Sequence, residues 1–156
     1  MTLASFNAAP EQAAVAAMLG CCASRRFATA MAAGRPYASE AAALAAVESV
    51  FQSLTWPDVL EAMDAHPRIG ARASGPSAAE QSGVAQESRA ALAAGNAAYE
   101  ERFGHVFLIC ATGLSGTQML GALRQRLKND EISEQRVVTT ELRKITVLRV
   151  RKALAE

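Results

Sequence analysis

The spacing of apolar residues constrains the fold of this chain more than any other feature of its sequence. Apolar residues mostly recur at intervals of three and four positions, while alanine, leucine, glutamate and arginine are frequent and only 5% of the residues are aromatic. Such intervals place side chains on one face of a helix, and these four residue types favour helix formation. The sequence therefore predicts an all-α protein with about six to eight helices.

Length and charge narrow the class of protein further. A chain of 156 residues is long enough for one domain, because a domain of this size buries about two thirds of the surface that its unfolded chain exposes. No internal repeat or low-complexity tract divides it, so residues 1–156 are expected to form a single compact domain. The 16 basic and 15 acidic residues give a net charge of +1, which predicts binding to neither nucleic acid nor an anionic membrane.

The cysteines and the termini indicate a cytoplasmic protein. Three cysteines, with Cys21 and Cys22 adjacent, do not form a disulfide framework, and no Cys or His pair repeats at zinc-ligand spacing, so no metal is expected. The first residues lack the basic stretch and apolar core of a signal peptide, and no apolar run approaches the thickness of a bilayer. The last residues, ALAE, are not a peroxisomal address.

Capping and breaking residues predict where the helices begin and end. In the first half, the first expected helix has Pro10 in its first turn and stops at Gly20, and the second runs from about 24 to 33. The third runs from Ser39 to about 53, and the fourth starts at Thr55 and ends before His66. The stretch 66–76 is expected to be a loop, because it holds two prolines and two glycines. In the second half, one expected helix starts at Ser77, and a longer one carries Val84, Leu92, Tyr99 and Phe103 and ends at Gly104. A further helix starts at Ser115, and the last one follows Asn129. Residues 106–111 are expected to form a buried extended segment.

Two residues near the predicted loop are candidates for acid-base chemistry. His66 stands at the expected end of a helix, where the helix dipole favours the protonated imidazole of a proton donor. The alternative is a histidine that packs in a turn and bonds to the backbone. Glu80 lies in the first turn of the next expected helix and could face the same loop, but a capping box with Ser77 explains it equally well. Gln81 could be exposed to solvent.

Arg149 is more informative, because it follows Leu142 by seven positions and Ile145 by four. This spacing puts a guanidinium inside the apolar stripe of the last helix. It either extends to the edge of the stripe or holds an anion such as a substrate carboxylate. His105 is expected at the surface, and Cys110 is expected to act as a small apolar filler.

Several motifs, taken in order, resemble one enzyme family. They are RPY, a tryptophan-containing helix, HPRIG, SAAEQ, NAAYEERFG, VFLICATG and ELRKITVLRV. Together they cover most of the chain, and HPRIG followed by S-x-x-E-Q and N-x-x-Y-x-x-R-F-G is far more specific than any single part. In this order and spacing the sequence resembles 2-oxo-4-hydroxy-4-carboxy-5-ureidoimidazoline (OHCU) decarboxylase.

The resemblance implies an all-helical homodimer that forms S-allantoin and carbon dioxide in urate degradation without a cofactor. It implies that His66 is the acid-base residue and that Glu80 lies beside the substrate. The other substrate contacts that it implies are Pro67, Ser77, Gln81, Arg149 and the backbone of Phe107, Leu108, Ile109, Cys110 and Ala111. The sequence departs from the family at Leu114, where many bacterial relatives carry arginine, so that one side-chain contact is in doubt.

Two other functions are compatible with parts of the sequence. A helical interaction module would use the basic segment RKITVLRVRK to bind an acidic partner or nucleic acid. Such binding would be sensitive to salt and would depend on Lys144 and Arg151 but not on His66. A ring hydrolase acting on a neighbouring ureide would keep the enzyme site but release no carbon dioxide.

Overall fold

A computed structural model describes residues 1–66 and 86–155 of the chain. These residues form helices and no strand, which confirms the predicted all-α class. Within the described ranges the helices are α1 (Leu3–Ala8), α2 (Glu11–Cys21), α3 (Arg25–Ala33), α4 (Glu40–Ser53), α5 (Trp56–Met63), α7 (Gln86–Phe103), α8 (Gly116–Arg126) and α9 (Glu131–Leu154). The chain groups into two compact units: unit 1 is Met1–Ala65 with Leu142–Glu156, and unit 2 is His66–Glu141.

Side-chain caps fix most helix starts where the sequence predicts them. The hydroxyl of Ser24 accepts the N–H of Phe27 at 3.3 Å, and that of Ser39 accepts the N–H of Ala42 at 3.1 Å. Ser115 forms a full capping box with Gln118 at the start of α8. Such caps satisfy backbone N–H groups that have no partner inside the helix, so short polar residues determine the boundaries.

The beginning of the chain differs from the prediction. Helix α1 precedes Pro10, and the hydroxyl of Thr2 caps it by accepting the N–H of Ser5 at 3.1 Å. Pro10 is the N-cap of α2 and does not lie in its first turn. Gly20 does not end α2, because the helix continues to Cys21. Glycine inside a helix costs roughly 1 kcal/mol, and burial of the neighbouring Met18 and Cys21 offsets this cost.

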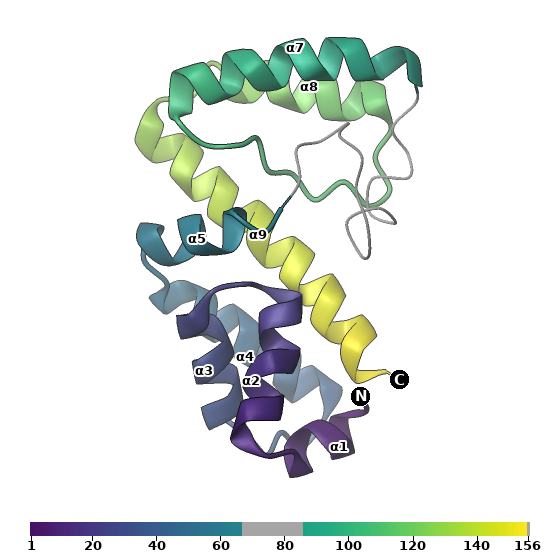
Figure 1. The fold of residues 1–156 in the computed structure, drawn as a ribbon. Helices are drawn as coiled ribbons and strands as arrows, with labels where there is room; N and C mark the ends of the chain where they lie inside the picture. Colours follow the sequence, from purple (N-terminus) through teal and green to yellow (C-terminus); the bar gives the residue numbers. More distant parts are fainter. Residues whose placement is uncertain (67–85, 156) are drawn as a thin grey trace. The chain divides into compact units, whose positions relative to one another are not determined.

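Unit 1 has a core of apolar side chains between short helices. Helix α2 packs against α3, and α3 packs against α4 and α5 (Figure 1). The last part of α9 belongs to this unit, with Ile145 and Val150 buried. Arg143 of α9 donates to the carboxylate of Glu48 in α4 at 2.7 Å. The C-terminal half of the last helix is therefore held in unit 1 by apolar packing and by an ion pair.

Unit 2 is built on α7 and α8, which pack side by side and run in the same direction (Figure 1). Two parallel helices cannot be joined by a tight turn. Residues 104–115 therefore run back along the two helices as an extended connection (Figure 1). Gly104 opens this connection with φ +79°, a backbone conformation that glycine adopts without strain. The core contains Leu92, Tyr99, Phe107, Ile109, Ala111, Met119 and Leu123.

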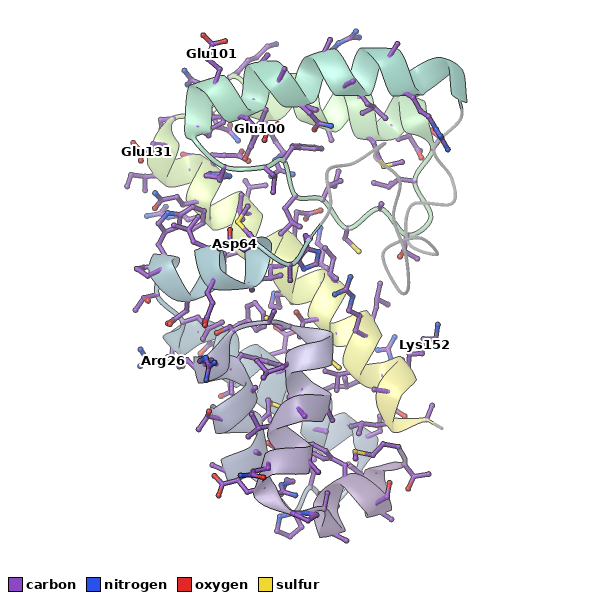
Figure 2. All side chains as sticks on the ribbon, viewed as in Figure 1. Arg26, Asp64, Glu100, Glu101, Glu131 and Lys152 are labelled. Atoms are coloured by element: carbon purple, nitrogen blue, oxygen red, sulfur yellow. The ribbon has the colours of Figure 1, made fainter. Side chains whose placement is uncertain are left out.

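Most labelled charged side chains of Figure 2 lie at the surface and point away from the ribbon, among them Glu101, Glu131 and Lys152. Two charged residues of unit 2 depart from this pattern, because Arg126 is 7% exposed and Glu134 is fully buried. Burial of an ionised group is costly unless the group is paired with an opposite charge, so each of these two residues is expected to have a charged partner. No helix in the described ranges is long and apolar enough to cross a membrane.

Candidate active site

The segment Phe107–Ala111 is buried and has no helical or strand hydrogen-bond pattern, as the sequence predicts. The side chains of Phe107, Leu108, Ile109 and Ala111 are at most 6% exposed, and Cys110 is half-buried. A buried segment outside helices and sheets needs other partners for its backbone polar groups. Its hydrogen bonds therefore show what determines its shape.

Side chains of α8 and α9 hold two of these backbone groups. The carbonyl of Leu108 accepts a hydrogen bond from Nη1 of Arg126 at 2.6 Å. The N–H of Cys110 donates to Oε1 of Glu141 at 3.1 Å. In an extended chain, the carbonyl of one residue and the N–H of the second residue along point to the same edge. Both helices therefore hold one edge of the segment, and in an extended chain the N–H and carbonyl of the residue between them, Ile109, face the opposite edge.

Arg126 belongs to a buried network that the sequence analysis did not identify. Its Nε and Nη2 donate to Oε2 of Glu134 at 2.9 and 2.6 Å, and its guanidinium lies 4.4 Å from the ring centre of Phe107. The hydroxyl of Tyr99 donates to the same carboxylate oxygen, and Nδ2 of Asn129 donates to Oε1 at 3.0 Å. Burial and the hydrogen bond to Glu134 raise the pKa of Tyr99, which keeps its phenol protonated.

A signal for this network is present in the sequence. Glu134 precedes Val138 by four positions and Leu142 by eight, so it lies on the apolar stripe of the last helix. Like Arg149, Glu134 is a charged residue within an apolar stripe, which indicates a specific partner.

Arg149 is half-buried in unit 1, close to the end of α2. Burial raises the pKa of the Cys21 thiol to about 11, and the positive charge of Arg149 acts on that thiol in the opposite direction. Burial likewise raises the pKa of Cys22 to about 11, again opposed by Arg149. The positive charge of Arg149 therefore acts on both thiols at the C-terminal end of α2. A guanidinium in such a partly buried position is suited to bind a carboxylate or a carbonyl group.

The position of His66 agrees with the expected end of a helix. Helix α5 ends at Met63 with Asp64 as its C-cap, and the half-buried His66 follows two residues later. The other loop candidates, namely Pro67, Ser77, Glu80 and Gln81, lie outside the described residues, and so does Val84 of the predicted apolar stripe.

His105 differs from its expected place at the surface. It is half-buried, and its ring packs edge-on against Tyr99 with 5.5 Å between ring centres and stacks on Phe103 at 6.2 Å. The aromatic cluster around Tyr99 draws it inward. Cys110 is half-buried, and the three cysteines are free thiols. Among the residues that the structure describes, no group of three or more Asp, Glu, His or Cys side chains could hold a metal ion.

A fixed backbone edge of this kind in unit 2 is suited to form hydrogen bonds with a small, planar, polar ligand. Comparison with known proteins identifies the family of the chain. Residues 7–151 match the family model of OHCU decarboxylase, so the chain belongs to the OHCU decarboxylase family.

Individual relatives agree with this assignment. The chain is 35% identical over 148 residues to the uric acid degradation bifunctional protein TTL of Arabidopsis thaliana, covering 87% of this chain and 46% of that protein. The chain thus spans about half the length of that curated relative. A crystal structure of OHCU decarboxylase in the presence of (S)-allantoin has a TM-score of 0.80 and 30% identity, covering 95% of this chain and 100% of the other. A structure of (S)-allantoin synthase shares the fold, with a TM-score of 0.73 and 17% identity over 99% of this chain and 54% of the other.

Proposed function

We propose that this chain decarboxylates OHCU to S-allantoin and carbon dioxide in the degradation of urate. The observation that carries the proposal is the continuous family match over residues 7–151, which runs through both units. The similarity to an OHCU decarboxylase structure obtained in the presence of (S)-allantoin supports the same reaction. Because the match is continuous, we propose that residues 1–156 act as one functional domain.

The chemistry of this substrate suits a protein that only positions groups and transfers protons. The carboxylate leaves a carbon that also bears a hydroxyl and adjoins a C=N bond. When the bond to the carboxylate breaks, its electron pair enters the ring through that neighbouring bond. The ring nitrogen of that bond takes a proton, the hydroxyl gives up its proton as its carbon becomes a carbonyl, and a proton added to one face of the adjoining carbon sets the S configuration. Orientation and acid-base catalysis suffice for these steps, so we propose that no cofactor takes part.

Each candidate residue receives a role in this scheme. His66 transfers the proton, and Glu80 and Gln81 hold the hydroxyl and the ring. Arg149 binds a charged or carbonyl group of the substrate, in keeping with its half-buried guanidinium. The remaining contacts are Pro67, Ser77 and the backbone of Phe107–Ala111.

We further propose that the protein is a cytoplasmic homodimer. Free cysteines fit a reducing compartment. A dimer of the 16.4 kDa chain would have a mass of 2 × 16.4 = 32.8 kDa in sedimentation equilibrium.

The proposal is tested by forming the substrate in situ with urate oxidase and hydroxyisourate hydrolase, adding the protein, and following circular dichroism. Rapid appearance of one allantoin enantiomer with release of carbon dioxide is the expected result. His66→Ala is expected to lower turnover at least about 100-fold, as loss of a general acid-base residue does. His105→Gln alters the other histidine of the chain and is expected to retain activity.

The same assay separates the alternative functions. A ureide ring hydrolase would consume substrate without releasing carbon dioxide, and an interaction module would show no turnover. Unchanged turnover by a folded His66→Ala protein would remove the proposed mechanism.

A further inference from the structure

The hydrogen bonds of unit 2 assign a role to two residues that the proposed mechanism does not use. Arg126 holds the carbonyl of Leu108 at 2.6 Å, and Glu141 holds the N–H of Cys110 at 3.1 Å. Both contacts are made to one edge of the segment Phe107–Ala111, on either side of Ile109. We propose that Arg126 and Glu141 are positioning residues that fix the direction of the N–H and carbonyl of Ile109 toward the substrate. This inference rests on the proposed function.

The ligand has hydrogen-bonding groups that can pair with the N–H and carbonyl on this edge. The N–H and carbonyl of one extended residue form an adjacent donor and acceptor on the same side of the chain, as they do between antiparallel strands. A cyclic amide or ureide presents the complementary N–H and carbonyl in one plane. Two parallel hydrogen bonds fix the plane of such a ring, and small errors in orientation cost large factors in rate.

The buried ion pair explains how Arg126 is held in place. Glu134 is fully buried and accepts two hydrogen bonds from this guanidinium, so the third nitrogen, Nη1, has a fixed direction toward Leu108. A buried ion pair adds little net stability compared with apolar residues of similar volume, whereas it can specify one arrangement of the groups around it. The pair is therefore better explained by positioning than by stability.

Two substitutions of Glu141 distinguish the effect of losing the hydrogen-bond acceptor from the effect of losing the negative charge. In Glu141→Gln the amide oxygen still accepts the N–H of Cys110, so kcat/KM is expected to stay within threefold of the wild type. Glu141→Ala removes the acceptor and is expected to lower kcat/KM at least tenfold, mainly in kcat, with an unchanged pH profile. The matched control is Thr140→Ala, an exposed position beside Glu141 on α9, which is expected to retain wild-type kinetics.

Arg126→Lys provides an independent test. Lysine keeps a positive charge for Glu134 but cannot serve both the carboxylate and the Leu108 carbonyl in the geometry of the guanidinium. A folded Arg126→Lys protein is therefore expected to lose at least tenfold in kcat/KM.

Amide hydrogen exchange measured by NMR gives a readout that does not depend on the reaction. Exchange at Cys110 is expected to accelerate in Glu141→Ala and to remain slow in Glu141→Gln. Wild-type kcat and KM in folded Glu141→Ala and Arg126→Lys proteins would overturn the inference, as would a Glu141→Gln protein as impaired as Glu141→Ala. If the wild type itself shows no decarboxylation, the proposed function fails, and this outcome is distinct from active variants beside an active wild type.

Discussion

At the scale of single residues, the burial of Cys21 and Cys22 makes the stability of the protein depend on pH. Burial raises the pKa of each thiol from 9.0 to about 11. Between these values the unfolded chain releases protons that the folded chain retains, so rising pH stabilises the unfolded state. We expect the free energy of unfolding to fall as pH rises from 9 toward 11. Since one pKa unit corresponds to about 1.4 kcal/mol, the two thiols together contribute at most about 5 kcal/mol to this fall.

Urea unfolding at pH 8, 9 and 10.5 measures this effect. Other groups titrate in the same range, so the control is the Cys21→Ala/Cys22→Ala variant, whose stability is expected to depend less on pH. An equal pH dependence in the wild type and in this variant would show that the thiols are not responsible.

Prediction at the scale of residues is most informative where a charged residue interrupts an apolar stripe. Arg149 lies on the apolar stripe of α9 and is half-buried, while its contact with substrate stays a prediction. Glu134 lies on the same stripe, yet its partners Arg126 and Tyr99 are 8 and 35 positions away. Spacing within one helix identifies a buried charge, but only packing between helices identifies the group that neutralises it.

At the scale of secondary structure elements, boundaries set by side-chain caps were predictable because a cap is a local interaction. Helices α3, α4 and α8 start directly after Ser24, Ser39 and Ser115, as expected. Helix α1 was missed because it is only six residues long, and isolated helices of that length have little stability of their own. Burial of Phe6 against Tyr37, with 6.3 Å between ring centres, stabilises it, and this contact joins residues 31 positions apart, which no local pattern reveals.

Two exposed glycines of unit 2 give a matched prediction at this scale. Gly121 lies within α8 and Gly104 has φ +79°, and a Cβ atom at either position would meet nothing within 4 Å. Gly121→Ala is expected to raise the free energy of unfolding by about 0.5–1 kcal/mol, because alanine favours helix. Gly104→Ala is expected to lower it by about 1–2 kcal/mol, because a side chain is strained at positive φ. Urea denaturation of both variants measures the difference, and a stabilising Gly104→Ala would contradict it.

At the scale of the whole molecule, the grouping of the chain into two units was not predictable from local patterns. Helical periodicity indicates which face of a helix is buried, but not which distant segment covers it. Helix α9 illustrates this, because residues up to Glu141 belong to unit 2 and residues from Leu142 belong to unit 1. The apolar stripe through Val138, Leu142 and Ile145 is continuous in the sequence, so it gives no sign of the change.

We propose that residues 1–156 act as one functional domain, so a bound ligand is expected to stabilise both units. At a concentration 100 times its dissociation constant, (S)-allantoin is expected to raise the free energy of unfolding by about 2.7 kcal/mol. The fluorescence of Trp56, the single tryptophan of the chain, follows unit 1, and amide exchange in α7 follows unit 2. Since proton delivery to one face sets the configuration, (R)-allantoin is the matched control and is expected to stabilise neither unit to the same extent. Stabilisation of one unit alone would mean that the two units unfold independently and do not act as one domain, while equal effects of the two enantiomers would contradict a stereospecific site.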